Sequence, residues 1–305
     1  MRNKLFFAVI FACITFLSPV AVLAQNKGKG KKDIAIQLYS VRERIKSDAN
    51  EPGKSNSGYI AVLKLLGATG YTAVEAAGYN NGMFYNRTPE EFKKDVESAG
   101  MKVLSSHCTK GLSAEELASG DFTESLKWWD TAIKAHKAAG MKYIVTPWLE
   151  IPKTVKDLKT YCDYYNQVGK MCKEYGLQYG YHNHAHEYEK VEDQVKMLDY
   201  MIENTNPEYV FIEMDVYWTV IGKSSPVDYF KKYPGRFKML HIKDHREIGQ
   251  SGMVGFDAIF KNADTAGVKD IVVEFEGYTT SIEDCLKISN DYLQQAPFVK
   301  TSYAK

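Results

Sequence analysis

Short apolar runs alternate along the chain with longer segments that carry apolar residues at helical spacing. Runs of this kind, rich in β-branched and aromatic side chains, are typical of buried strands, and the segments between them predict amphipathic helices. The expected strands cover residues 34–39, 71–75, 103–107, 143–147, 178–183, 210–214, 237–242 and 271–275. Because the strands alternate with helices, the pattern predicts a parallel sheet.

Glycine marks the end of the helical segment in several of these units. The positions are Gly70, Gly100, Gly140, Gly176 and Gly267, and a β-rich run follows each of them within a few residues. Glycine is favoured there because the residue after a helix often needs a positive φ. A unit of helix, glycine stop and strand therefore repeats along the chain.

Signals for individual helices fit the same repeat. The segment 88–91, Thr-Pro-Glu-Glu, predicts a helix start in which Thr caps, Pro occupies the first turn and the second Glu completes a capping box. Residues 158–175 and 191–204 carry apolar side chains at helical spacing. Both segments are expected to be helices.

Eight such units predict an α/β protein that closes into a single (β/α)₈ TIM barrel over residues 33–295, followed by a C-terminal tail over 296–305. An open doubly wound sheet is the alternative architecture. That fold usually has a Gly-rich phosphate loop after its first strand, and none follows residues 34–39. The closed barrel is therefore favoured.

The first residues have the pattern of a secretory signal peptide. Arg2 and Lys4 precede an apolar run, and small residues lead to a cleavage position after Ala24. A retained membrane anchor is the alternative, but the polar tether over residues 25–32 favours cleavage. We therefore expect a secreted or periplasmic protein that has no membrane contact after signal cleavage.

The charge balance limits the classes of partner. The chain has 39 Lys and Arg against 38 Asp and Glu, and loss of residues 1–24 would remove two basic and no acidic side chains. Such a neutral protein lacks the basic field that holds a phosphate backbone, so no nucleic acid partner is expected. The sequence is compatible with a homo-oligomer and does not fix the oligomeric state.

Four cysteines remain after the expected cleavage, at Cys108, Cys162, Cys172 and Cys285. Cys162 and Cys172 fall in one expected helix, where ten residues would separate them by about 15 Å, which is too far for a disulfide. We interpret these residues as buried thiols.

The segment 177–187, Leu-Gln-Tyr-Gly-Tyr-His-Asn-His-Ala-His-Glu, ends an expected strand with three histidines, an amide and a carboxylate. His182 and His184 share one face of such a strand, and Asn183 points to the other. Neutral imidazoles at a strand end suit Zn, Mn, Fe or Co. The alternative is a polar surface loop that happens to be rich in histidine.

Three further strand ends carry candidate metal ligands. Asp215, His241 and Glu274 each interrupt or end an apolar run, where a charged side chain is costly to bury unless it is paired or bound to metal. In a barrel these residues lie at the same end of consecutive strands as His182. Any one of them is explained by contact with solvent, but together they predict one divalent metal ion, Mn, Co, Zn or Fe.

These motifs resemble the xylose isomerase-like barrel proteins, the sugar phosphate isomerase/epimerase group that includes inosose dehydratases and keto-sugar epimerases. The resemblance covers residues 34–293. It rests on the segments 181–184 (Tyr-His-Asn-His), 214–218 (Met-Asp-Val-Tyr-Trp), 240–244 (Leu-His-Ile-Lys-Asp) and 273–274 (Val-Glu). It implies one divalent metal held from strands five to eight by His182, Asp215, His241 and Glu274, with His182 or His184 as the strand-five ligand.

The resemblance also implies the chemistry, with one departure. Epimerase-like members use a strand-five and a strand-eight glutamate as opposed bases, and here His182 stands at the first position. The remaining candidate catalytic residues are Glu274, His184, Glu187 and Lys243. This set favours removal of a proton next to a carbonyl of a keto sugar or 3-keto-glycoside, followed by β-elimination. Isomerisation or epimerisation of a non-phosphorylated sugar and a non-catalytic carbohydrate-binding barrel are the alternatives.

Candidate substrate-binding residues also lie at or near strand ends. They are Glu75, His107, Trp148, Asn183 and Trp218. Aromatic faces there often carry a sugar ring, and polar groups can bind its oxygens, although core packing and ion pairing are the alternative roles. Trp128 and Trp129 lie inside an expected helix and are interpreted as packing residues. A small, unphosphorylated carbohydrate is the expected substrate, because phosphate esters are chiefly cytoplasmic.

Overall fold

The computed structural model describes residues 30–49 and 57–304. The expected signal peptide, residues 1–24, and residues 25–29 of the expected tether lie outside the described residues. The chain divides into the units Met1–Gly30 and Lys31–Lys305, and the second of these contains the barrel.

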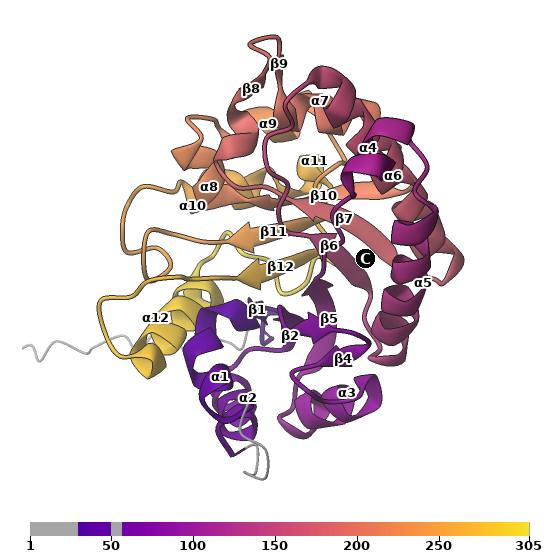
Figure 1. The fold of residues 1–305 in the computed structure, drawn as a ribbon. Helices are drawn as coiled ribbons and strands as arrows, with labels where there is room; N and C mark the ends of the chain where they lie inside the picture. The colour runs from indigo at the N-terminus through magenta and orange to yellow at the C-terminus, as the bar shows by residue number, and fades with distance from the viewer. Residues whose placement is uncertain (1–29, 50–56, 305) are drawn as a thin grey trace, which may run out of the picture. The chain divides into compact units, whose positions relative to one another are not determined.

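Parallel strands close into a barrel at the centre of the second unit (Figure 1). Around the barrel the strands follow the order β1, β12, β11, β10, β7, β6, β5, β2. Their bounds are β1 Ala35–Gln37, β2 Ala73–Ala76, β5 Lys102–His107, β6 Tyr143–Thr146, β7 Gln178–His182, β10 Val210–Asp215, β11 Met239–Ile242 and β12 Asp270–Val273. The predicted (β/α)₈ TIM barrel is confirmed, and each predicted strand overlaps an observed one.

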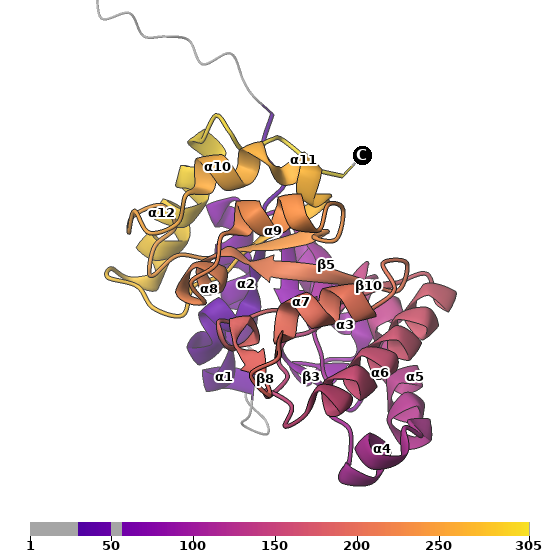
Figure 2. The same cartoon turned by 90° about the horizontal axis from the view of Figure 1, so that it is seen from above.

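Helices surround the barrel, as the view turned by 90° also shows (Figure 2). Their bounds are α1 Arg42–Ala49, α2 Ser57–Thr69, α3 Pro89–Ser98, α4 Ala114–Ser119, α5 Thr123–Ala138, α6 Val155–Glu174, α7 Met197–Asn204, α8 Val216–Ile221, α9 Pro226–Lys232, α10 Phe256–Lys261, α11 Ala263–Ala266 and α12 Ile282–Gln295, with single 3₁₀ turns at Leu38–Val41 and His186–Tyr188. The predicted capping box at the start of α3 is confirmed, because Thr88 and Glu91 bond reciprocally to each other's backbone N–H groups.

One predicted helix boundary was wrong. The helix expected over residues 191–204 begins only at Met197, because residues before it form a short hairpin of β8, Lys190–Val191, and β9, Val195–Lys196. Glu192 and Asp193 turn this hairpin with φ values of 50° and 55°. The apolar spacing of the segment suits both a helix and a short strand pair, so the hydrophobic pattern alone could not separate them.

The barrel interior is layered. Alternate residues of each strand point inward, and the deeper layer is an apolar cluster made of Ala35, Tyr143, Val145, Phe211, Met239 and Val272. Towards the carboxyl ends of the strands the inward positions become polar, for example at Glu213 and Asp215. The apolar layer closes the bottom of the barrel, so the polar residues above it open only towards the carboxyl ends.

The larger apolar cluster fills the space between the barrel and the helices. Cys108, Cys162, Cys172 and Cys285 are buried free thiols, as predicted. After α12 the chain still packs on the barrel, since the Asp33 N–H donates to the Thr301 carbonyl at 2.8 Å. Within the described ranges, none of the helices is long and apolar enough to cross a bilayer.

The layered interior makes Gly180 a sensitive position. A Cβ atom on Gly180 would stand 2.6 Å from the Phe211 ring, which lies on the neighbouring strand β10. We expect Gly180→Ala to lower the free energy of unfolding by about 1–3 kcal/mol, because the ring must move within a filled core. Urea denaturation measures the change. Gly111→Ala is the control, since no described atom would lie within 4 Å of its Cβ; an equal loss in both variants would contradict the packing explanation.

Candidate functional site

A cavity of about 530 Å³ opens at the carboxyl ends of the strands. A cavity of this size can hold a small organic ligand. The predicted site residues that line it are His107, Trp148, His182, His184 and Glu274. Tyr39, Tyr79, Trp128 and Glu276 also line it and were not predicted as site residues. The predicted location of the site at this end of the barrel therefore agrees with the cavity.

Asp215, His241 and Glu274 converge beside this cavity. One ligand-type atom of each lies within 4.8 Å of those of the other two, and all three side chains are at least 96% buried, since Glu274 is the most exposed at 4%. Asp215 ends β10 and caps α8, where its Oδ1 accepts the Trp218 N–H at 2.8 Å. Its Oδ2 is buried without a hydrogen-bond partner among the described residues.

His241 uses its two ring nitrogens on opposite sides. Its Nε2 lies 2.7 Å from Oε1 of Glu75, and its Nδ1 lies 3.6 Å from Oε2 of Glu274. The second distance exceeds hydrogen-bond length, and Nδ1 is buried without a partner in the described part of the chain. An unpartnered imidazole nitrogen and carboxylate oxygen next to a second carboxylate form a donor set that fits Zn, Mn, Co or Fe.

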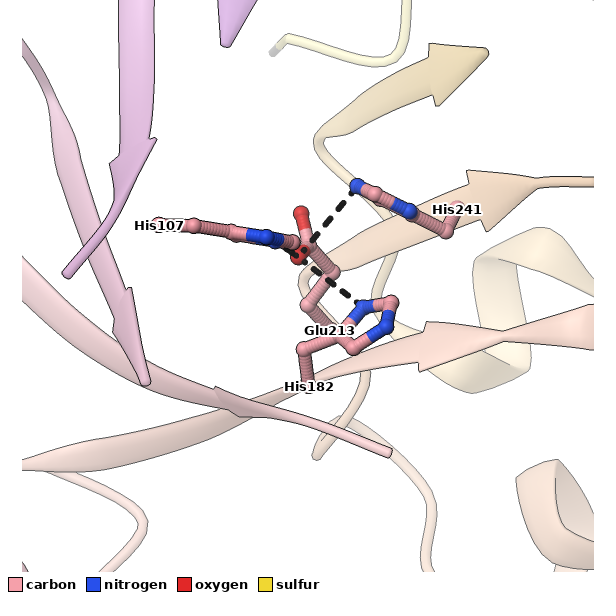
Figure 3. A group of neighbouring side chains, drawn as sticks. All are labelled: His107, His182, Glu213 and His241. Atoms are coloured by element: carbon pink, nitrogen blue, oxygen red, sulfur yellow. Dashed lines mark hydrogen bonds and ion pairs between the residues drawn. The ribbon is translucent and has the colours of Figure 1, made fainter. Parts of the chain in front are cut away.

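A second cluster lies deeper and shares His241 (Figure 3). In it the Glu213 carboxylate is surrounded by three imidazoles: its Oε2 lies 3.0 Å from His107 Nε2, 3.3 Å from His182 Nδ1 and 3.5 Å from His241 Nε2. Glu75 joins the same group, with Oε1 3.2 Å from His107 Nε2. His182 thus belongs to this inner cluster in the structure and is not within the 4.8 Å grouping of Asp215, His241 and Glu274.

Sequence reasoning missed Glu213. The residue is fully buried, two positions before Asp215 on β10, and it pairs in register with His182 of β7. Alternation along a strand places Glu213 on the same inward face as Asp215. A second carboxylate inside an apolar strand was therefore a signal that the strand pattern already contained.

Burial and neighbouring charges set different protonation states for these carboxyl groups. Burial raises the pKa of Asp215 to about 7, although Lys243 and His241 oppose the shift. Burial and the adjacent Glu75 raise the pKa of Glu213. Burial alone would also raise the pKa of Glu274, but Lys243 and then His241 bring it below the ordinary value. Glu274 is therefore the carboxylate that stays ionised most readily.

Lys243 supplies fixed positive charge behind the cavity lining. Its Nζ lies 2.9 Å from Glu274 and 2.8 Å from Glu276, and it sits 5.0 Å from the centroid of the Trp218 ring. Burial alone would lower the pKa of Lys243, but the Glu274 and Asp215 carboxylates raise it above the ordinary value. Lys243 consequently remains an ammonium ion at neutral pH.

The loop after β7 places His184 in the lining of the cavity, whereas Glu187 of the same loop is buried and does not line it. Glu187 accepts hydrogen bonds from the Tyr181 hydroxyl and the His184 backbone N–H, both at 2.8 Å, and is fully buried. Burial and then the Lys243 charge lower the pKa of His184 to about 3, so its imidazole is neutral. Asn183 is buried beside this loop, where its Oδ1 accepts the Asp215 backbone N–H at 3.3 Å.

The five predicted substrate-binding residues occupy different places. His107 and Trp148 line the cavity, and Trp148 is 45% exposed with its ring 4.8 Å from that of His184. Glu75, Asn183 and Trp218 lie behind the lining and contact other site residues. Their role in binding substrate stays a prediction. Trp128 was interpreted as a packing residue, but it borders the cavity, whereas Trp129 is fully buried in the core.

The pKa of Asp215 predicts a pH dependence for metal binding. Below about pH 7 the metal-free carboxyl group holds a proton that a metal must displace, and above pH 7 it is ionised. We expect the affinity for Zn²⁺ or Mn²⁺ to fall at least about tenfold between pH 8 and pH 6. Competition with a chelating dye measures the dissociation constant. Equal constants at both pH values would contradict this assignment of Asp215.

Comparison with known proteins agrees with this architecture. The family model described as xylose isomerase-like TIM barrel matches residues 63–296. Inosose dehydratase from Salmonella agona (strain SL483) is 23% identical over 229 residues, which cover 68% of this chain and 73% of that protein. A sugar phosphate isomerase/epimerase from Parabacteroides distasonis ATCC 8503 superposes with a TM-score of 0.79 at 32% identity, covering 92% of this chain and 99% of that one. The zinc-bound IOLI protein has the same fold, with a TM-score of 0.64 at 15% identity over 85% of this chain and 95% of that chain. The chain belongs to the xylose isomerase-like TIM barrel family.

Proposed function

We propose that this protein is a divalent-metal-dependent enzyme that removes a proton next to a carbonyl group of a keto sugar or 3-keto-glycoside, with β-elimination favoured over isomerisation. The observation that carries the proposal is the convergence of Asp215, His241 and Glu274 beside the cavity. Two potential ligand atoms there, Asp215 Oδ2 and His241 Nδ1, are buried and have no hydrogen-bond partner among the described residues. Those three side chains would hold the metal. The strand-five ligand would be His182 or His184.

A bound divalent ion would polarise the substrate carbonyl and make the adjacent C–H bond more acidic. Lys243, held as an ammonium ion beside Glu274, would stabilise negative charge that develops on a substrate oxygen. Because Lys243 keeps its proton, it serves as a source of positive charge and not as the base. Glu274 and neutral His184 both line the cavity and are the candidate bases.

Elimination is favoured because β7, the fifth strand of the barrel along the chain, carries His182 where epimerase-like members have a second glutamate. Epimerisation needs bases on both faces of the carbon that loses its proton. In this cavity the carboxylates, Glu274 and Glu276, both follow β12, the eighth strand of the barrel. In an elimination the base takes the α-proton, the electron pair forms a C=C bond, and the neighbouring C–O bond breaks. The leaving oxygen then takes a proton from water.

The lining of the cavity supports an uncharged sugar. Among the described residues that line it there is no Lys or Arg, while Glu274 and Glu276 contribute carboxylates. Lys243 pairs with both carboxylates from behind the lining, so a phosphate group would find no unpaired Lys or Arg among the described lining residues. The aromatic rings of Tyr39, Trp128 and Trp148 provide surfaces on which a sugar ring or an aglycone can pack.

The relatives and the N-terminal sequence support other parts of the proposal. Relatives named inosose dehydratase and sugar phosphate isomerase/epimerase support proton removal from a sugar-like substrate, and the zinc in the IOLI protein supports a metal. The signal-like residues 1–24 support export, so we propose a secreted or periplasmic location.

Turnover in deuterated water tests the proposed reaction. Metal-loaded protein is incubated with 3-keto-glycosides and free keto sugars, and the products are followed by NMR. We expect release of the aglycone together with an unsaturated sugar, because the C–O bond breaks after proton removal. Deuterium incorporation into an otherwise intact sugar would support isomerisation instead.

The matched controls separate chemistry from binding. Asp215→Asn removes a proposed metal ligand but keeps the shape of the side chain, so turnover should fall at least about 100-fold. Glu150→Gln alters an exposed carboxylate that accepts the Trp148 indole N–H at 3.0 Å, and it should retain turnover. Saturable sugar binding without turnover in the metal-loaded protein would contradict the proposal and favour a non-catalytic carbohydrate-binding barrel.

A further inference from the structure

Glu75 is a fully buried carboxylate that does not line the cavity. It lies on β2, in the first half of the barrel, whereas Asp215, His241 and Glu274 come from the second half. Its closest imidazole contact is Nε2 of His241, at 2.7 Å. We propose that Glu75 is a positioning residue that holds His241 with the proton on Nε2, so that Nδ1 presents its lone pair to the metal. The inference rests on the proposed metal-dependent function.

The geometry of the His241 ring carries the first step. To bind a metal the His241 imidazole must be neutral, so it then has one N–H donor and one lone pair, and a carboxylate can only accept. Nε2 must therefore be the donor to Glu75, which leaves the lone pair on Nδ1. That atom lies 3.6 Å from Glu274 Oε2, and within residues 30–49 and 57–304 it has no hydrogen-bond partner although it is buried.

Glu75 is itself fixed from both neighbouring strands. Its Oε1 accepts from Gln37 Nε2 at 2.8 Å, and its Oε2 accepts from Ser105 Oγ at 2.6 Å. Gln37 and Ser105 lie beside Glu75 in the register of β1 and β5, and both are fully buried. The carboxylate therefore cannot turn away from His241 without breaking a buried hydrogen bond.

Glu213 is the weaker candidate for this role towards His241. Its Oε2 stands 3.5 Å from His241 Nε2 and is closer to His107 and His182. A carboxylate that accepts the N–H of a metal-bound imidazole fixes the tautomer and raises the basicity of the ligand. The shorter contact and the support from two strands assign that role for His241 to Glu75.

Zinc affinity of the Glu75→Gln variant tests the inference. Gln keeps the size of the side chain and an acceptor oxygen but removes the charge. We expect the zinc dissociation constant to rise by about 10- to 100-fold while one equivalent of zinc still binds. Ser105→Ala, which removes one support of Glu75 and leaves its charge, should give a smaller rise. Thermal unfolding of each metal-free variant shows whether the fold is retained.

Glu116→Gln is the matched control. Glu116 is also a buried carboxylate, with hydrogen bonds from Ser113 and from both the backbone and the hydroxyl of Ser125, but it belongs to the capping box of α4. Its variant should lose some thermal stability and bind zinc as the wild type does. A comparable loss of zinc affinity in Glu116→Gln would mean that general destabilisation explains the effect, and it would overturn the inference.

The tautomer of His241 gives a readout that does not depend on stability or activity. Long-range ¹H–¹⁵N NMR of the zinc-loaded protein should show His241 protonated at Nε2 with zinc on Nδ1. Three results would each overturn the positioning role: zinc bound to Nε2, an unchanged zinc affinity in Glu75→Gln, or two bound zinc ions of which Glu75→Gln loses one. Unchanged affinity with normal wild-type binding leaves the proposed function standing, whereas a wild-type protein that binds no zinc refutes the function and this inference together.

Discussion

The contact between His241 and Glu75 is the interaction on which the site depends. It joins the proposed metal ligands Asp215 and Glu274 to the inner cluster of His107, His182 and Glu213. A buried carboxylate is tolerated only when it is paired, and Glu75 obtains its pairing from His241, His107, Gln37 and Ser105. The same bonds that make the charge tolerable therefore also fix the direction of the imidazole.

The barrel makes this arrangement possible by separating two interior layers. The apolar layer around Tyr143, Phe211 and Met239 fills the interior near the amino ends of the strands. Above it, alternate strand positions bring Glu75, Glu213 and His241 together from sequence positions up to 166 residues apart. Water is excluded from below, so charges in the polar layer interact strongly with one another and with groups in the cavity. Chemistry is thereby confined to the open end.

Much of the fold and part of the site could be predicted from the sequence. Short apolar runs that alternate with helical patterns identified each barrel strand, and charged residues at strand ends identified Asp215, His241 and Glu274 as neighbours. Glu213 was missed because it lies two residues before the end of β10, although alternation along the strand already places its side chain on the inward face. The direction of the His182 ring towards Glu213 could not be predicted, because it depends on which buried partner reaches each nitrogen.

Other features depended on tertiary context. The role of Trp128 at the cavity is set by how α5 packs against the barrel, and an aromatic pair in a helix gives no sign of which ring will face a cavity. Likewise, Glu187 was predicted as a catalytic residue, and the structure shows a buried carboxylate that accepts hydrogen bonds from the Tyr181 hydroxyl and the His184 backbone N–H. Its catalytic role stays a prediction. The sequence identifies residues of the types that catalysis needs, but the packing of the fold determines which of them line the cavity.

The most direct test of the central claim is the position of a bound metal, located by anomalous X-ray scattering from crystals of the zinc- or manganese-loaded protein. We expect one anomalous peak bordered by Asp215 Oδ2, His241 Nδ1 and the Glu274 carboxylate. A peak between His107, His182 and Glu213 instead, or no ordered peak at either cluster, would contradict it.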